Sequence, residues 1–348
     1  MIETERLLLR KMDESDYEGL YELFSSEDVC RYMTNNTFNK EQAMSLLDRI
    51  IQLYDRLDTE RFSIILKEDN SFVGYIDINC FISFNPAVGY AILKRCWGRG
   101  YMQEALNAFT SYLFNLGYQK VFIEIVKENG ASLRVADKCG FTFLKEEREI
   151  LSKVKPYEVD IVTLYKNNPK YEMLIEMEKI TPQNIEVAHQ IEHKIFPLYD
   201  AYNNYLDSFK EGSKNEYWIL KVGNEMIGVS GIYSYKAFPE DAWLAFFGLL
   251  EEWRNKHLGG QALTLFELVA KQRGFINVRL FTDRYDNDES KNFYLRHGYQ
   301  EEYYELDSDP DSKIYSLSIF SKCLKAGEEL IPWDNRDIHF TKQVKKQQ

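Results

Sequence analysis

The feature that most constrains the fold of this chain is that the sequence repeats itself. Three stretches recur in the same order: SFVGYIDI (71–78) as EMIGVSGI (225–232), RCWGRG (95–100) as RNKHLG (254–259), and ENGASLRVADKCGF (128–141) as DNDESKNFYLRHGY (286–299). We align Arg95 with Arg254 at an offset of 159 residues, and the third pair at an offset of 158. Self-similarity at a nearly constant spacing predicts two copies of one domain.

The length agrees with two domains, because 348 residues is about twice the size of a common domain. We expect an N-terminal domain at 1–168, a C-terminal domain at 172–322 and a tail at 323–348 that fits neither copy and ends in polar residues. The joint falls in YKNNPKYE (165–172), where Asn-Asn-Pro is turn chemistry.

Hydrophobic periodicity predicts the same succession of helices and strands in both copies. In copy one we expect strands at 6–12, 62–67, 71–81, 87–93, 120–126, 141–149 and 159–166, and helices at 13–26, 40–57, 99–117 and 130–138. In copy two we expect a hairpin across Gly223-Asn224, strands at 242–250 and 276–282, helices at 183–196, 258–273 and 288–297, and two closing strands. The aromatic stretch at 196–209 suits either the cover of a pocket or ordinary core packing.

The charge composition restricts the classes of molecule that this protein can bind. Acidic residues outnumber basic ones by 55 to 43, and this net charge of −12 argues against nucleic acid, which binds basic surfaces. It agrees with a cationic partner, and equally with plain solubility. No apolar run reaches about 18 residues, so we expect no membrane contact. The N-terminus lacks a signal-peptide layout and the five cysteines never form CxxC, so we expect reduced thiols in the cytoplasm. Oligomerisation stays open.

Two glycines stand where a helix is about to begin. A strand, a loop with Gly98 and Gly100, and a helix from about residue 99 together make an anion cradle. The first amides of a helix lack internal partners, and the helix dipole places positive potential there. The alternative is a tight turn without a ligand. The spacing fits neither a P-loop nor a dinucleotide-binding fingerprint.

The chain resembles the GNAT superfamily of acetyl-CoA-dependent N-acetyltransferases, in two tandem copies. Copy one, through IETERLLLRKMDESD, VGYAIL…CWGRGYMQEAL and ENGASLRVADKCGF, is similar to the branch that acetylates ribosomal-protein N-termini. Copy two, through FFGLLEEWRNKHLGGQAL and DNDESKNFYLRHGYQEE, resembles the general branch. The resemblance implies an α+β fold: two tandem GNAT folds, each a central mixed, mostly antiparallel sheet flanked by helices.

The same resemblance implies where acetyl-CoA binds. In copy one the pyrophosphate would lie on the loop and helix start formed by Arg95, Gly98, Arg99, Gly100 and Tyr101. In copy two the corresponding residues would be Arg254, Lys256, His257, Leu258, Gly259 and Gly260, with His257 in place of the middle glycine. The strand before each loop would splay from its neighbour and pair with pantetheine near Ile92 and Leu249. Asn129 and Asn287 match an asparagine near the pantetheine arm, and both also suit a helix N-cap.

Acetyl transfer needs a neutral amine, donors for the oxyanion and a proton for the thiolate. Tyr294 matches the tyrosine that supplies this proton in the family; its alternative is a core tyrosine on a helix. Copy one has Ala136 there, and Ser132 matches a serine that some members use, or is a small helix residue. Glu240 and Asp241 are the candidate bases of copy two, or an acidic turn.

We therefore expect a cytoplasmic acetyltransferase that acts on a small amine, such as an amino-sugar or amino acid, or on a peptide N-terminus. Direct transfer in a ternary complex is favoured, since Cys96 has no histidine beside it in sequence. The alternative is a non-catalytic acyl-CoA-binding or interaction protein with two degenerate copies.

One motif points elsewhere. HQIEH (189–193) fits the zinc-peptidase pattern H-x-x-E-H, with His189 and His193 on one helix face. The context is wrong for a peptidase and the sequence offers no third ligand, so we expect solvent-exposed histidines and no metal.

Overall fold

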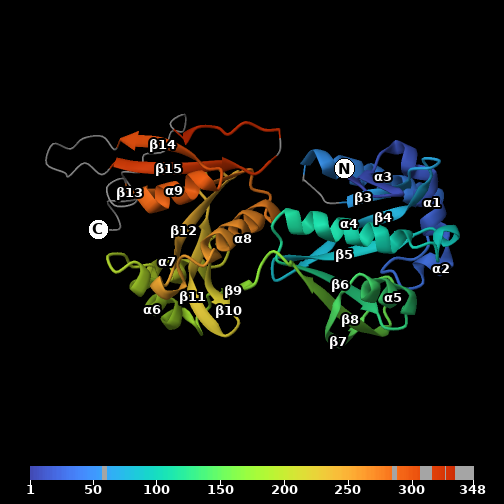
Figure 1. The fold of residues 1–348 in the computed structure, drawn as a ribbon, viewed down its shortest axis with the longest axis horizontal. Coiled ribbons are helices and arrows are strands. Elements are labelled where there is room, and N and C mark those ends of the chain that lie inside the picture. The colour runs from blue at the N-terminus through green and yellow to red at the C-terminus, as the bar shows by residue number, and fades with distance from the viewer. Residues whose placement is uncertain (57–60, 284–287, 306–315, 326, 334–348) are drawn as a thin grey trace. The chain divides into compact units, whose positions relative to one another are not determined.

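The computed structural model describes residues 1–56, 61–283, 288–305, 316–325 and 327–333 (Figure 1). The chain divides into two compact units, Met1–Glu172 and Met173–Gln348, here called unit 1 and unit 2. Within the described ranges, no helix combines the length and the apolar character that crossing a membrane requires.

Unit 1 is built on an eight-stranded sheet with the order β1-β2-β3-β4-β5-β6-β8-β7. Only β5 and β6 run parallel, and every other neighbouring pair is antiparallel. The strands are β1 Ile2–Glu3, β2 Leu7–Lys11, β3 Arg61–Leu66, β4 Phe72–Ile82, β5 Asn85–Ile92, β6 Lys120–Val126, β7 Thr142–Ile150 and β8 Glu158–Asn167. The helices are α1 Tyr17–Ser25, α2 Glu27–Cys30, α3 Lys40–Arg56, α4 Tyr101–Asn115 and α5 Gly130–Lys138, with short 3₁₀ turns at Glu14–Asp16 and Lys94–Cys96.

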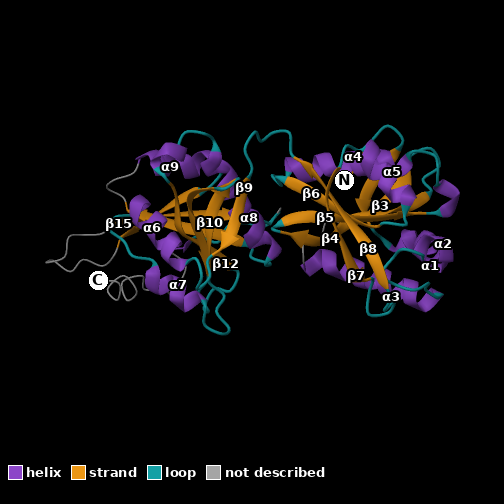
Figure 2. Ribbon diagram, turned by 90° about the horizontal axis from the view of Figure 1, so that it is seen from below, coloured by secondary structure: helices purple, strands orange, loops and turns teal. Residues whose placement is uncertain are grey.

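The helices of unit 1 cover both faces of its sheet (Figure 2). Phe109 of α4 packs edge-on against Phe62, which pairs with Ile76 in the neighbouring strand. Tyr75, which directly precedes Ile76 in β4, points to the other face and stacks on Phe24 of α1. Side chains alternate along a strand, so α4 and α1 must lie on opposite sides.

Unit 2 repeats this plan with a seven-stranded sheet ordered β14-β15-β13-β12-β11-β10-β9, in which only β12 and β13 are parallel. Its strands are β9 Ile175–Lys179, β10 Glu216–Val222, β11 Glu225–Tyr233, β12 Asp241–Leu249, β13 Asn277–Asp283, β14 Gln300–Glu305 and β15 Ser316–Cys323. Its helices are α6 Ile185–Ile195, α7 Tyr202–Ser208, α8 Leu258–Gln272 and α9 Asp288–Arg296, with a 3₁₀ turn at Glu251–Trp253.

Two buried clusters hold the helices of unit 2 to its sheet. Ile219 on β10 packs with Ala188 of α6 and Tyr205 of α7, whereas the next residue, Leu220, packs with Ala262 of α8. Helices α6 and α7 therefore cover one face of the sheet and α8 covers the other. The expected α+β fold, a mixed and mostly antiparallel sheet flanked by helices in each copy, is confirmed.

Four elements were absent from the expectations: β1, β9, α7 and the four-residue helix α2. Strands β1 and β9 are short edge strands of two and five residues, too short for a periodic signal. Helix α7 lies within the aromatic stretch 196–209, and its Tyr205 is fully buried, so that part of the stretch is core. The tail beyond 322 was expected to fit neither copy, yet Trp333 is buried in unit 2 against Trp243. Residues 334–348 lie outside the described residues.

Candidate active site

The central parallel strands of unit 1 pair at one position only. Ala87 of β5 faces Phe122 of β6, and no later residue of β5 pairs with β6 in the described structure, although β6 stays paired with β8 to its end. We call the region between Val88–Ile92 and Ile123–Val126 the β5–β6 wedge. It matches the splayed strand pair that the family resemblance implied.

The backbone of β5 presents donors and acceptors to this wedge. Leu93 N–H donates to Val73 O on β4 at 2.8 Å. Because hydrogen-bonding direction alternates along a strand, Ile92 and Tyr90 turn their backbone groups to the other side, toward the wedge. The Ile92 carbonyl accepts a hydrogen bond from Trp97 Nε1 at 3.0 Å, and its N–H faces the wedge.

Unit 2 has the same geometry. Pairing between β12 and β13 is confined to Asp241–Trp243 opposite Asn277–Arg279. Residues Leu244–Leu249 of β12 and Leu280–Asp283 of β13 pair with their other neighbours but not with each other. We call the region between these two segments the β12–β13 wedge. Leu250 N–H donates to Ile227 O at 2.9 Å, so Leu249 turns its backbone toward the wedge, and its carbonyl accepts from Arg254 Nε at 3.0 Å.

Each wedge strand is followed by a loop that contains a short 3₁₀ turn and then by a helix, whose N-cap residue has the left-handed conformation. Gly100, with φ of 78°, is the N-cap of α4, and His257, with φ of 60°, is the N-cap of α8. Two residues earlier, Gly98 and Asn255 also have positive φ, of 74° and 59°. These turns point the first amides of each helix outward, as an anion cradle requires.

This geometry corrects the alignment of the two loops. We aligned Arg95 with Arg254 and Gly98 with His257, an offset of 159, but the helix caps place His257 at Gly100, an offset of 157. His257 therefore replaces the capping glycine and not the middle one. Trp97 and Arg254 become equivalent, and both donate a side-chain N–H to the last wedge carbonyl, of Ile92 and Leu249.

The charged residues of the first loop have different surroundings. Arg95 makes an ion pair with Glu22 of α1 at 3.0 Å and donates to Phe72 O, so its charge is turned toward α1. Arg99 has an exposed side chain, and its carbonyl accepts from Arg6 at 3.0 Å. A Cβ built on Gly98 meets no atom within 4 Å, so the space above this loop is open to a ligand.

A network ties this loop to the N-terminal strands. Glu104 of α4 accepts hydrogen bonds from the Thr4 hydroxyl at 2.6 Å and from the backbone and side chain of Arg6 at 2.8 and 2.7 Å. The Arg6 guanidinium also lies over the Tyr101 ring at 4.8 Å. Burial raises the pKa of the Glu104 carboxyl, but these donors outweigh it and lower the pKa overall.

In the second loop, Lys256 is exposed and its Nζ lies 4.6 Å from the Trp253 ring centroid. Leu258 has a fully buried side chain, so only its backbone can meet a ligand. A Cβ on Gly259 would lie 3.4 Å from Phe293, and one on Gly260 would lie 2.8 Å from His297 Nε2. These two glycines allow α9 to pack closely on α8.

The asparagine expected near pantetheine in unit 1 caps α5. Asn129 Oδ1 accepts from Ser132 N–H at 3.2 Å, which confirms the N-cap interpretation. The Tyr90 hydroxyl donates to Ser132 O at 3.4 Å and so links the wedge strand to α5. Ala136 is fully buried behind them. The corresponding Asn287 of unit 2 lies outside the described residues.

Tyr294 lies on α9 with 7% of its surface exposed. Its ring packs against Phe293, Tyr299 and Phe320 at centroid distances of 5.1, 5.7 and 5.5 Å. Burial raises the pKa of the phenol well above its ordinary value, so the hydroxyl keeps its proton throughout the neutral range. A neutral phenol is the form that a proton donor needs.

The acidic pair Glu240 and Asp241 lies at the start of β12, where β12 and β13 are still paired. Asp241 is fully buried, and its carboxylate accepts from Arg279 Nε at 2.8 Å and from Asn277 Nδ2 at 2.9 Å. This is a structural ion pair. Glu240 is half-buried, and its carbonyl accepts the N–H of Ile276 and of Asn277.

A further carboxylate, Glu124, was not selected from the sequence. It lies on β6 in the β5–β6 wedge, two residues beyond the last paired residue. Its side chain is exposed, yet partial burial of the carboxyl group, together with Glu149 and Glu147, raises its pKa. The available signal was an acid inside the largely apolar strand KVFIEIV. A carboxylate with a raised pKa beside a splayed strand pair is a functional candidate.

Comparison with known proteins gives one family match in each unit. Residues 6–142 match the acetyltransferase (GNAT) domain family, and residues 183–299 match the acetyltransferase (GNAT) family. The uncharacterized N-acetyltransferase p20 of Bacillus licheniformis is 30% identical over 142 residues, which cover 40% of this chain and 80% of that protein. The uncharacterized N-acetyltransferase YoaA of Bacillus subtilis (strain 168) is 27% identical over 171 residues, or 48% of this chain and 97% of that protein.

Among solved structures, a GNAT-family acetyltransferase from Bacillus anthracis aligns with 48% of this chain and 98% of its own, at 24% identity and a TM-score of 0.43. Each of these proteins therefore matches about half of this chain. The two family matches lie one in each unit and together span most of the sequence. With a splayed parallel strand pair before a helix cradle in both units, this chain belongs to the GNAT family of acetyltransferases as a tandem of two GNAT domains.

Proposed function

We propose that this protein transfers the acetyl group of acetyl-CoA directly to a primary amine, either a small molecule such as an amino-sugar or amino acid, or a peptide N-terminus. The observation that carries the proposal is the wedge and helix cradle found in each unit. The cradle amides suit the CoA pyrophosphate, and the backbone groups at Ile92 and Leu249 suit the amides of pantetheine.

Direct transfer is supported by the state of the cysteines in unit 1. An acetyl-enzyme would need a thiolate, which forms most readily at a lowered pKa. Burial instead raises the pKa of the thiols of Cys30, Cys80 and Cys96, and raises that of Cys139 to about 11. The amine itself is the better nucleophile for the thioester.

The proton-transfer roles divide between the units in this proposal. In unit 2, Tyr294 protonates the departing thiolate, and Glu240 accepts the amine proton, since Asp241 is held by Arg279. In unit 1, Ser132 and Glu124 take the corresponding roles, because Ala136 replaces the tyrosine. An α-amine suits such a site, because its neutralisation at pH 7 costs about 1.4 kcal/mol against about 4.6 kcal/mol for a lysine-like amine.

The test is release of free thiol from acetyl-CoA over a panel of amines, with the full-length chain. In a Gly100→Glu background, where only unit 2 can hold CoA, Tyr294→Phe is expected to lower kcat about 100-fold without weakening CoA binding, because it removes the proton donor alone. Tyr299→Phe is the matched control, since this ring packs on Tyr294 and is also buried. Unchanged turnover in Tyr294→Phe would refute its role as the acid. Binding of CoA without thiol release for any amine would favour a non-catalytic acyl-CoA-binding protein.

A further inference from the structure

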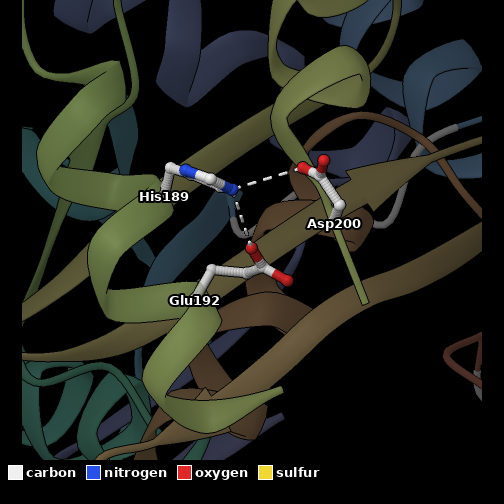
Figure 3. Close-up of side chains that lie close together, drawn as sticks. All are labelled: His189, Glu192 and Asp200. Atoms are coloured by element: carbon white, nitrogen blue, oxygen red, sulfur yellow. Dashed lines mark ion pairs between the residues drawn. The ribbon is translucent and has the colours of Figure 1, made fainter. Parts of the chain in front are cut away.

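Three potential metal ligands converge in unit 2, away from the wedge. His189 and Glu192 are three residues apart on one face of α6, and Asp200 lies just before α7 (Figure 3). His189 Nε2 is 3.3 Å from Asp200 Oδ1 and 4.0 Å from Glu192 Oε2, and the three ligand atoms lie within 4.8 Å of one another. The imidazole nitrogen points between two carboxylates.

Glu192 is the unusual member of this cluster. Its side chain is fully buried, and neither carboxyl oxygen makes a hydrogen bond. Burial raises the pKa of this carboxyl, while the Ala201 N–H, which faces it without reaching hydrogen-bond geometry, acts in the opposite direction. A buried carboxylate that makes no hydrogen bond and has its ion-pair partner 4.0 Å away is costly.

A second buried polar group, close to Glu192, also makes no hydrogen bond. The Tyr205 hydroxyl of α7 is fully buried and makes no hydrogen bond. Burial and the nearby charge of Glu192 raise the pKa of this phenol. Two unsatisfied buried groups at one place indicate that a further chemical group belongs between α6 and α7.

We propose that His189, Glu192 and Asp200 bind a divalent transition-metal ion of the Zn²⁺ class. Tetrahedral Zn²⁺ with bonds of about 2.0–2.2 Å spaces its ligand atoms about 3.3 Å apart, as His189 Nε2 and Asp200 Oδ1 already are. The 4.0 Å distance to Glu192 closes with a shift of less than about 1 Å. One imidazole with two carboxylates favours Zn²⁺ over Ca²⁺ or Mg²⁺, which prefer all-oxygen sites.

The ligand set differs from the one that the sequence motif offered. H-x-x-E-H would use His189 and His193, but the His193 side chain is exposed and lies outside the cluster. Asp200 is the third ligand that the sequence did not reveal, because it approaches α6 only through the turn at 196–201. It also accepts the Tyr202 N–H at 2.9 Å, which holds its carboxylate toward His189.

The ion would fasten α6 to the chain that leads into α7. Phe196, between these helices, packs on Phe246 of β12 at 6.3 Å, and its ring lies 2.9 Å from a Cβ built on Gly248. Phe246 and Gly248 both belong to β12, the strand that borders the β12–β13 wedge. Metal binding would thus fix the helical cover on this face of unit 2, and it can be measured without any acetyl transfer.

The test is calorimetric titration of full-length protein, stripped of metal by a chelator, with ZnCl₂, and the shift in Tm that the ion produces. Wild type is expected to bind Zn²⁺ at this site with an increase in Tm, and Ca²⁺ is expected to have no such effect. His189→Gln and Asp200→Asn are expected to weaken this binding at least about 10-fold. Glu192→Gln is expected to raise the Tm of the metal-free protein and to abolish the Zn²⁺-dependent increase, which simple loss of an ion pair would not do.

His193→Gln is the matched control, because it removes a neighbouring exposed histidine on the same helix and is expected to bind Zn²⁺ like wild type. Any Zn²⁺ bound by cysteine thiols elsewhere is common to all variants. A Zn²⁺ response that survives unchanged in His189→Gln and Asp200→Asn would overturn the proposal. Equal loss in His193→Gln and His189→Gln would overturn the ligand assignment, and absence of any Zn²⁺ response in wild type would overturn both.

Discussion

At the scale of single residues, partners from distant elements decide what a charged side chain can do. Arg95 flanks the first cradle in sequence, yet Glu22 of α1 holds it. Asp241 is the first residue of the second wedge strand, yet Arg279 of β13 binds it. The sequence correctly placed both residues near the site, but their roles depend on partners more than 30 residues away. Position along the chain alone cannot reveal such pairing.

Glu124 is the opposite case, because it was not selected from the sequence and its surroundings in the fold make it a candidate base. Its pKa is raised, so the carboxyl becomes the ionised, proton-accepting form only as pH rises through a value above the ordinary 4.3 or so. We predict that turnover in a His257→Glu background, where only unit 1 can hold CoA, rises with pH through that value. Glu124→Gln is expected to remove this limb of the pH–rate profile and to lower kcat about 100-fold.

Glu149→Gln provides the matched control for that profile. Glu149 is exposed on β7, and its like charge is one of the causes that raise the pKa of Glu124. Its neutralisation is expected to move the acidic limb to lower pH and to leave kcat at its plateau. A profile that is identical in wild type and Glu124→Gln would exclude Glu124 as the base.

At the scale of elements, the sequence was sufficient for nearly every long helix and strand. Helix α4 shows why, since its buried residues Met102, Leu106, Phe109 and Leu113 recur every three or four positions. The sequence was insufficient to predict the two-residue β1 and helix α7, and it was insufficient to align the two cradle loops with each other. A two-residue error in the loop alignment followed from matching arginines, whereas the fold matches left-handed helix caps.

The left-handed caps give a reciprocal prediction. His257 occupies a conformation that costs a side-chain-bearing residue about 1 kcal/mol, and Gly100 occupies the same conformation without that cost. His257→Gly is expected to raise the Tm of unit 2 by about 2–4 °C, and Gly100→His to lower that of unit 1 by a similar amount. Differential scanning calorimetry of the full chain measures both. A lower Tm of unit 2 in His257→Gly together with a higher Tm of unit 1 in Gly100→His, or no change in Tm in either variant, would show that the caps are not strained in this way.

At the scale of the whole molecule, one architecture occurs twice with different residues at the candidate site. Unit 1 keeps glycine at its helix cap and has Ala136 on α5, whereas unit 2 has His257 at the cap and Tyr294 on α9. Duplication of the cradle was visible from the sequence because it is a local pattern of strand, loop and helix. The wedges were expected only through family resemblance, because strand separation depends on pairing between segments that are distant in sequence.

The central claim is that each unit holds one CoA on its wedge and cradle. Isothermal titration of the full-length chain with CoA tests it most directly, together with Gly100→Glu and His257→Glu, which place a carboxylate at one cradle each. The account predicts two CoA per chain in wild type, one in each variant and none in the double variant. One or no CoA bound by wild type, or two CoA still bound by either single variant, would contradict it.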